Sequence, residues 1–177
     1  NHTDRDTWEQ TLARYFDLDL LIAYLATEMF LADHDGLAGD WGLNNFYLYR
    51  YEDSDRFQLV PWDKDVNFRE PERDVYTGFE GHALIGPALS QPRLREAYVA
   101  ALRRAAAVSS EPAADGSGPG WLEREVGRQA ALIRTAAYED EQKAYSNPRF
   151  DQEVDWMLAF ARHRAAQVLR QVGPAER

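Results

Sequence analysis

The sequence DHDGLAGDWGLNNFYLYRYEDSDRFQLVPWDKD occupies residues 33–65 and is the most informative part of the chain. It begins with an acidic loop, continues through two segments rich in aromatic residues, and ends with two aspartates one residue apart. The carboxylates of Asp63 and Asp65 and the side-chain amide of Asn45 offer hard oxygen donors. Such donors suit Mg²⁺ and a phosphate-bearing substrate. The stretch therefore predicts a magnesium and phosphate site.

The two aromatic segments predict a β-hairpin. Phe46–Tyr51 and Arg56–Trp62 flank a polar turn of four residues, and Pro61 should end the pairing of the second strand. Because both ends of a hairpin lie close together, Asn45 and Asp63 should reach one ion. An acidic loop, an Asn, a hairpin and an Asp also follow one another in protein kinases, where they supply the catalytic Asp and two metal ligands.

The rest of the chain predicts helices around this hairpin. The segment before the loop, up to Leu31, is apolar nearly all round, so we expect a buried central helix. Residues 66–89 show no period and predict an extended surface loop. We expect further helices from Ser90 onwards with Pro92 in the first turn, from Trp121 to about Tyr145, and from Asn147 to the Gly173-Pro174 stop signal.

These elements predict a mainly α fold with one short β-hairpin (α+β), arranged as a single domain or lobe over residues 1–177, with a flexible loop at 110–120. In the Trp121 helix, Leu122, Val126, Ile133 and Ala137 should point inward.

Composition and charge exclude several classes of protein and of binding site. A formal net charge of −10 argues against a nucleic-acid binder, which needs a basic face. No apolar run approaches the ~20 residues that span a bilayer. There is no cysteine, so disulfides and thiolate metal sites are excluded. Basic residues are nearly all Arg and Ala is abundant, which suggests a GC-rich bacterial source. The chain starts with Asn and shows no signal peptide, so we expect a fragment or a processed product.

Three separated motifs in the same order resemble the CotH (spore coat protein H) family of atypical protein kinases. They are Asp35-Gly36, Asn44-Asn45-Phe46-Tyr47-Leu48-Tyr49 and Val60-Pro61-Trp62-Asp63-Lys64-Asp65, and the similarity runs from about Trp8 to Val172. The resemblance implies the helical C-terminal lobe of a kinase-like fold, ATP with Mg²⁺ or Mn²⁺, and phosphoryl transfer to Ser or Thr of a protein substrate. It also implies a bacterial spore-coat or secretory setting.

Site residues follow from the resemblance position by position. Asn45 and Asp63 take the roles of the metal-binding Asn and Asp, Asp65 belongs to the same metal motif, and Asp65 and Trp62 are candidates for cofactor contact. Trp62 could equally pack in the core. The catalytic Asp is either Asp40, which has the five-residue spacing to Asn45 of ordinary kinases, or Asp35. Asp35 matches the family's helix-ending pattern better, and we favour it.

The upstream lobe of a kinase, with its phosphate-covering loop and strand Lys, has no counterpart in the chain. The two lysines are Lys64 and Lys143, and neither is placed for that role. Lys64 lies between two aspartates and should form a charge-neutralising ion pair. We therefore expect the N-terminal lobe to be missing, and the fragment alone to be inactive.

Other functions compete with the kinase hypothesis. Asp33, Asp35 and Asp40 with two glycines faintly resemble a calcium loop, which would make the chain a calcium-stabilised structural or interaction domain, but the bidentate Glu of an EF-hand is absent. A pseudokinase that has lost turnover is another possibility. His34, beside two of these aspartates, could bind metal, although a surface or capping role is the simpler interpretation.

Overall fold

The computed structural model describes residues 5–173, so the ends of the 1–177 lobe lie outside the described residues. The chain forms two compact units. The first comprises Asn1–Asn67 and Arg73–Arg104, and the second comprises Phe68–Glu72 and Ala105–Arg177.

The first unit is built around a buried helix. Helix α1 (Arg5–Ala13) is followed by α2 (Leu18–Phe30), and the carboxylate of Asp17 accepts hydrogen bonds from the backbone N–H groups of Asp19 and Leu20. This N-cap satisfies two of the donors that a helix start leaves open. As its apolar sequence predicted, α2 forms much of the core, with the buried residues Leu18, Leu21, Ile22, Leu25, Ala26, Met29 and Phe30.

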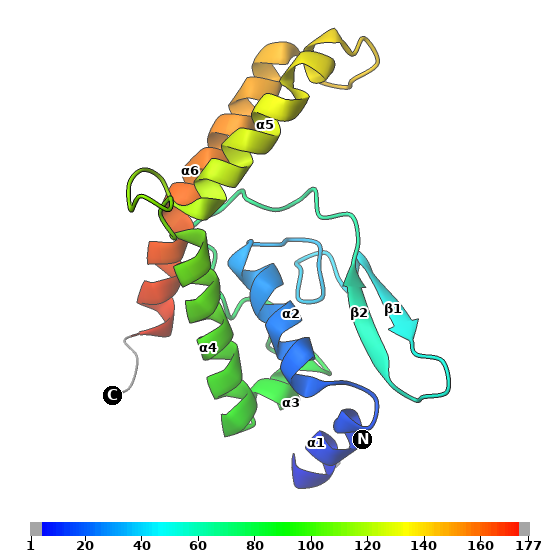
Figure 1. Cartoon of the computed structure of the whole chain (residues 1–177). Helices are drawn as coiled ribbons and strands as arrows, with labels where there is room; N and C mark the ends of the chain where they lie inside the picture. Colours follow the sequence, from blue (N-terminus) through cyan, green and yellow to red (C-terminus); the bar gives the residue numbers. More distant parts are fainter. Residues whose placement is uncertain (1–4, 174–177) are drawn as a thin grey trace. The chain divides into compact units, whose positions relative to one another are not determined.

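The predicted hairpin is present. Strand β1 (Phe46–Arg50) pairs antiparallel with β2 (Phe57–Pro61), and Phe46 lies opposite Pro61. The outer edge of β2 is tied to the start of α2, because the N–H of Phe57 donates to the carbonyl of Tyr15 at 2.6 Å. Six helices and this two-stranded sheet make up the secondary structure of the described residues (Figure 1), so the α+β prediction is confirmed.

The prediction of a surface loop over 66–89 is wrong in two respects. The segment ends in a short helix, α3 (Ile85–Leu89), and its middle is anchored in the interior. Val75 is fully buried, and its carbonyl accepts a hydrogen bond from the hydroxyl of Tyr98 in α4 (Pro92–Ser109). The segment lacks hydrophobic periodicity because single contacts of this kind hold it in place, rather than one apolar face of a helix or strand.

The second unit contains a helical hairpin. Helices α5 (Trp121–Glu139) and α6 (Asn147–Val172) lie side by side and antiparallel (Figure 1), and the hydroxyl of Ser146 caps α6. Helix α5 stops earlier than predicted, because Asp140 adopts an extended conformation and its carboxylate accepts from the N–H of Gln142. Leu122 and Val126 are buried as expected, but Ile133 is exposed, so its predicted inward position is wrong.

A buried arginine fixes α6 to the short 68–72 segment of the same unit. Arg164 is fully buried, and its Nη1 donates to the carbonyl of Pro71 at 2.7 Å, while Phe68 packs edge-on against Phe160. Within residues 5–173, no helix is long and apolar enough to cross a membrane.

Candidate functional site

The acidic loop starts from a buried charge cluster at the end of α2. Glu28 and Asp33 are both buried, and Lys64 places its Nζ 2.5 Å from Oε1 of Glu28 and 2.8 Å from Oδ2 of Asp33. The predicted ion pair of Lys64 is therefore real, but its partners lie in another part of the chain. Since Lys64 stands between Asp63 and Asp65, the cluster ties the segment that carries these two aspartates to the end of α2.

Gly36 is required because the loop folds tightly over these carboxylates. A Cβ atom at this position would lie 2.6 Å from Oδ2 of Asp33 and 2.7 Å from Oε2 of Glu28. The same Glu28 oxygen accepts the backbone N–H of Leu37 at 2.8 Å. The Asp-Gly motif thus has a packing reason: only glycine lets the loop approach the buried acids.

Asp35 is held at the open end of the hairpin. Its N–H donates to Oδ1 of Asp33, which forms a local turn, and its carboxylate accepts from both asparagines of the motif. Nδ2 of Asn44 donates to Oδ1 at 2.9 Å, and Nδ2 of Asn45 donates to Oδ2 at 2.7 Å. This contact leaves the amide oxygen of Asn45 out of the bond, and it joins a predicted catalytic residue directly to a predicted metal residue.

Asn45 and the Asp63 region meet across the hairpin. The carbonyl of Asn45 accepts the N–H of Trp62 at 3.0 Å, which extends the ladder by one pair beyond Phe46 and Pro61. Asn45 has φ 56° and Asp63 has φ 45°, both in the left-handed region that Asn and Asp tolerate better than most residues. Both strands therefore turn sharply where the ligands are expected, and Asp63 and Asp65 are exposed.

Asp40 has different partners from those of Asp35. Arg73, itself buried, donates from Nη1 and Nη2 to the two carboxylate oxygens of Asp40, each at 2.9 Å. Nδ1 of His34 lies 2.8 Å from Oδ2 of Asp40. The hydrogen bonds from Arg73, aided by His34, lower the pKa of Asp40 to about 2. Both oxygens are already used in a clamp that ties Arg73 to the loop.

An acid titration tests this clamp. A pKa lowered in the folded state adds stability above the unfolded value of about 3.9 and loses it as the pH falls towards 2. We expect Asp40→Asn to lower the urea midpoint at pH 7 and to make it less dependent on pH between 4 and 2 than in the wild type. Equal slopes in the two proteins over this range would contradict the assignment.

The structure settles other details of the predicted site. Trp62 is 57% exposed and packs edge-on against Tyr47, so the alternative of a core role is wrong. His34 is largely buried beside Asp40, and the simpler interpretation of a surface role is wrong. Glu28 and Arg73 were not singled out from the sequence. For Glu28 there was a signal, because it is a lone acidic residue within an otherwise apolar stretch of helix.

The donor set fits Mg²⁺ bound together with phosphates. Among residues 5–173, no three His, Cys, Asp or Glu side chains gather closely enough to hold a metal ion by themselves. Mg²⁺ is usually held by one or two carboxylates, with substrate phosphates and water completing its shell. Asp63, Asp65 and the amide oxygen of Asn45 are donors of this kind, so the residues are compatible with a shared metal–nucleotide site.

Comparisons with known proteins agree with the motifs. The model of the "CotH kinase protein" family matches residues 1–168. The chain is also similar to "Inner spore coat protein H" of Bacillus subtilis (strain 168), with 22% identity over 174 residues. That match covers 93% of this chain and 44% of the relative, so the chain spans less than half the length of the relative. The family match covers nearly the whole chain, and the chain belongs to the CotH kinase protein family.

Proposed function

We propose that this chain supplies the catalytic loop and the metal-binding Asn and Asp of a bacterial kinase that transfers phosphate from Mg-ATP (or Mn-ATP) to Ser or Thr of a protein substrate. The observation that carries the proposal is the chain of contacts from the Asp35 carboxylate through the Asn45 amide to the backbone of Trp62. These contacts bring a base, an amide oxygen and the Asp63 motif to one end of the hairpin. Membership of the CotH family supports the same chemistry.

In this proposal the protein mainly positions the reactants. Asn45 and Asp63 would hold the metal, with Asp65 as a further ligand, and Trp62 and Asp65 would contact the nucleotide. The metal would supply positive charge against the phosphates. Asp35 orients the hydroxyl of the substrate and accepts its proton, while the two Asn amides keep its carboxylate in place.

Asp35 is the better candidate for the base, because both carboxylate oxygens of Asp40 already accept hydrogen bonds from Arg73. A carboxylate clamped by a bidentate arginine and with a pKa near 2 accepts a proton poorly. We expect Asp35→Asn in the full-length protein to lower kcat by at least about a hundredfold, and Asp40→Asn to keep kcat within about tenfold of the wild type. Incorporation of phosphate into a protein substrate measures both.

Circular dichroism and the urea midpoint are needed beside kcat, because Asp40→Asn should reduce stability more than Asp35→Asn does. The opposite ranking of kcat, with both variants folded, would transfer the role of base to Asp40.

The remaining lobe is proposed to come from the rest of a longer protein. The chain covers 44% of its spore-coat relative, and the proposed reaction needs a phosphate-covering loop and a Lys from outside the chain. On this basis the 177 residues alone should show little phosphoryl transfer.

A non-catalytic role in the spore coat is the second candidate, and the name of the relative, a spore coat protein, favours it. A pseudokinase of this kind would keep the fold but would not catalyse phosphoryl transfer. Asp35→Asn would then leave phosphate incorporation at the same background level. A calcium-stabilised domain is a weaker candidate, because Lys64 already neutralises Asp33 and Arg73 already neutralises Asp40.

A further inference from the structure

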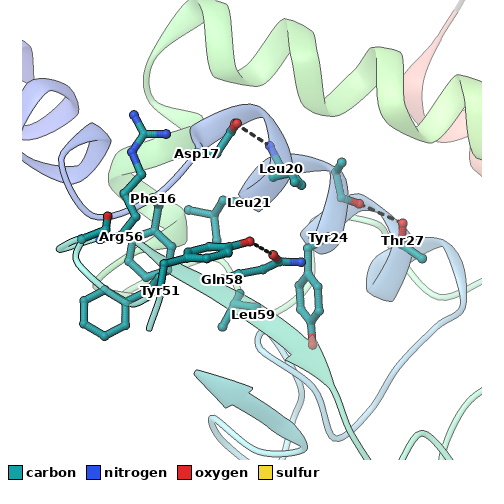
Figure 2. A pocket seen from close by; sticks show the side chains of 13 residues that line it. Phe16, Asp17, Leu20, Leu21, Tyr24, Thr27, Tyr51, Arg56, Gln58 and Leu59 are labelled. Carbon is teal, nitrogen blue, oxygen red and sulfur yellow. Dashed lines mark hydrogen bonds between the residues drawn. The ribbon is translucent and has the colours of Figure 1, made fainter. Parts of the chain in front are cut away.

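A hollow lies in the first unit, between α2 and the tip of the hairpin, and its lining includes none of the residues assigned to the proposed reaction. Its volume is about 630 Å³. Figure 2 shows Leu21 and Tyr24 of α2 on one side, with Tyr51, Gln58 and Leu59 of the hairpin around the rest of the space. Most of its lining is apolar.

The walls of this groove expose large apolar side chains. Leu20 is 47% exposed and Tyr51 is 43% exposed, whereas Leu21 and Leu59 are buried and form the floor. The hydroxyl of Tyr51 donates to Oε1 of Gln58, which fixes the hairpin side of the groove. An apolar floor with exposed apolar rims is typical of a surface that binds a partner.

The edge of β2 favours an extended partner. Asn45 pairs with Trp62, and Tyr51 pairs with Arg56, so the register directs the backbone groups of Phe57 and Leu59 away from β1. The N–H of Phe57 already donates to the carbonyl of Tyr15 on that side. The N–H and C=O of Leu59 point to the same outer edge, where an extended segment could pair with them.

The charge next to the groove favours a basic partner. The hairpin turn carries Glu52, Asp53 and Asp55, and only Asp55 is paired, with Arg50 at 3.1 Å. The described residues give Glu52 and Asp53 no side-chain hydrogen bond or ion pair. Arg56 places one positive charge on the rim of the groove. The formal net charge of the chain is −10, however, so the protein as a whole attracts a basic segment.

We propose that this groove docks an extended segment of the protein substrate, which inserts an apolar side chain between α2 and β2 and places Lys or Arg against Glu52 and Asp53. The proposal rests on the proposed kinase function, which gives the chain a protein substrate. Docking would raise the local concentration of the substrate without touching the reacting atoms.

The test uses the full-length protein and a fluorescein-labelled peptide in which two leucines alternate with glycines beside a pair of arginines. We expect Leu20→Glu to weaken binding at least about tenfold in fluorescence anisotropy. Glu52→Lys with Asp53→Lys should weaken binding and remove most of its salt dependence. The matched controls, Leu132→Glu on exposed α5 and Glu139→Lys with Glu141→Lys, should bind as the wild type does.

Kinetics then separate docking from catalysis. With a protein substrate that carries the same segment, Leu20→Glu should raise KM about tenfold and leave kcat within about twofold. Absence of peptide binding in a protein that still phosphorylates would overturn docking alone. Peptide binding without any phosphorylation would instead overturn the proposed function. Peptide binding to the 177-residue chain but not to the full-length protein would overturn docking, because another segment of the same protein would then fill the groove.

Discussion

Asp63→Asn in the full-length protein is expected to reduce Mg-dependent phosphorylation of a protein substrate by at least about a hundredfold. The substitution keeps the size of the side chain and removes the negative charge that would hold the metal. Asparagine also tolerates the left-handed φ of 45° at this position, whereas alanine would add backbone strain. Asp63→Asn therefore tests the charge rather than the conformation.

Stability should hardly change in this variant. Asp63 is exposed, so we expect its free energy of unfolding to stay within about 0.5 kcal/mol of the wild type. Asp155→Asn, an exposed aspartate on α6, is the matched control and should leave both activity and stability unchanged. Full activity of a folded Asp63→Asn protein would remove Asp63 from the site, and raising Mg²⁺ should partly rescue the variant if Asp63 binds metal.

The elements that form through local patterns could be predicted from the sequence. Segments rich in aromatic and aliphatic residues on both sides of a polar turn were enough for the hairpin, and the hairpin alone implied that Asn45 and Asp63 lie near its open end. The cap of α2 by Asp17 is equally local, because its partners are two and three residues away.

The long-range contacts could not be predicted. Lys64 was expected to form a neutralising ion pair between its two neighbouring aspartates, but its actual partners lie 36 and 31 residues earlier. Arg73 clamps Asp40 across 33 residues from a segment without any periodic pattern. The choice between Asp35 and Asp40 depends on these two contacts, so spacing alone could not make it.

Removal of the cation that neutralises the two buried acids should have the largest effect on stability. In Lys64→Met, Glu28 and Asp33 would remain buried without a positive partner, since their side chains are only 6% and 2% exposed. Loss of one partner of a buried ion pair typically costs about 3–5 kcal/mol. We expect a loss of this size in urea unfolding at pH 7, whereas Lys143→Met, which changes the other lysine of the chain, should cost little.

The pH dependence gives an independent check on Lys64. Burial alone would lower the pKa of its ammonium, but the hydrogen bonds with Asp33 and Glu28 outweigh burial and raise it. A raised pKa adds stability that is fully present below the unfolded value of about 10.4 and is lost as the pH rises through the folded value. The difference in stability between wild type and Lys64→Met should therefore be constant near neutral pH and shrink above about pH 10.5.

Neutralising the two acids should restore the stability of the Lys64→Met protein. In the triple variant with Glu28→Gln and Asp33→Asn, the amide oxygens can still accept the N–H groups of Leu37 and Asp35, but no charge is left buried. We expect most of the lost stability to return, because the cost lies in the uncompensated carboxylates. Phosphorylation should not return with it, since the tie that holds Asp63 and Asp65 against the end of α2 is gone. A triple variant that recovers both stability and activity would show that Lys64 only balances charge and does not position the metal motif.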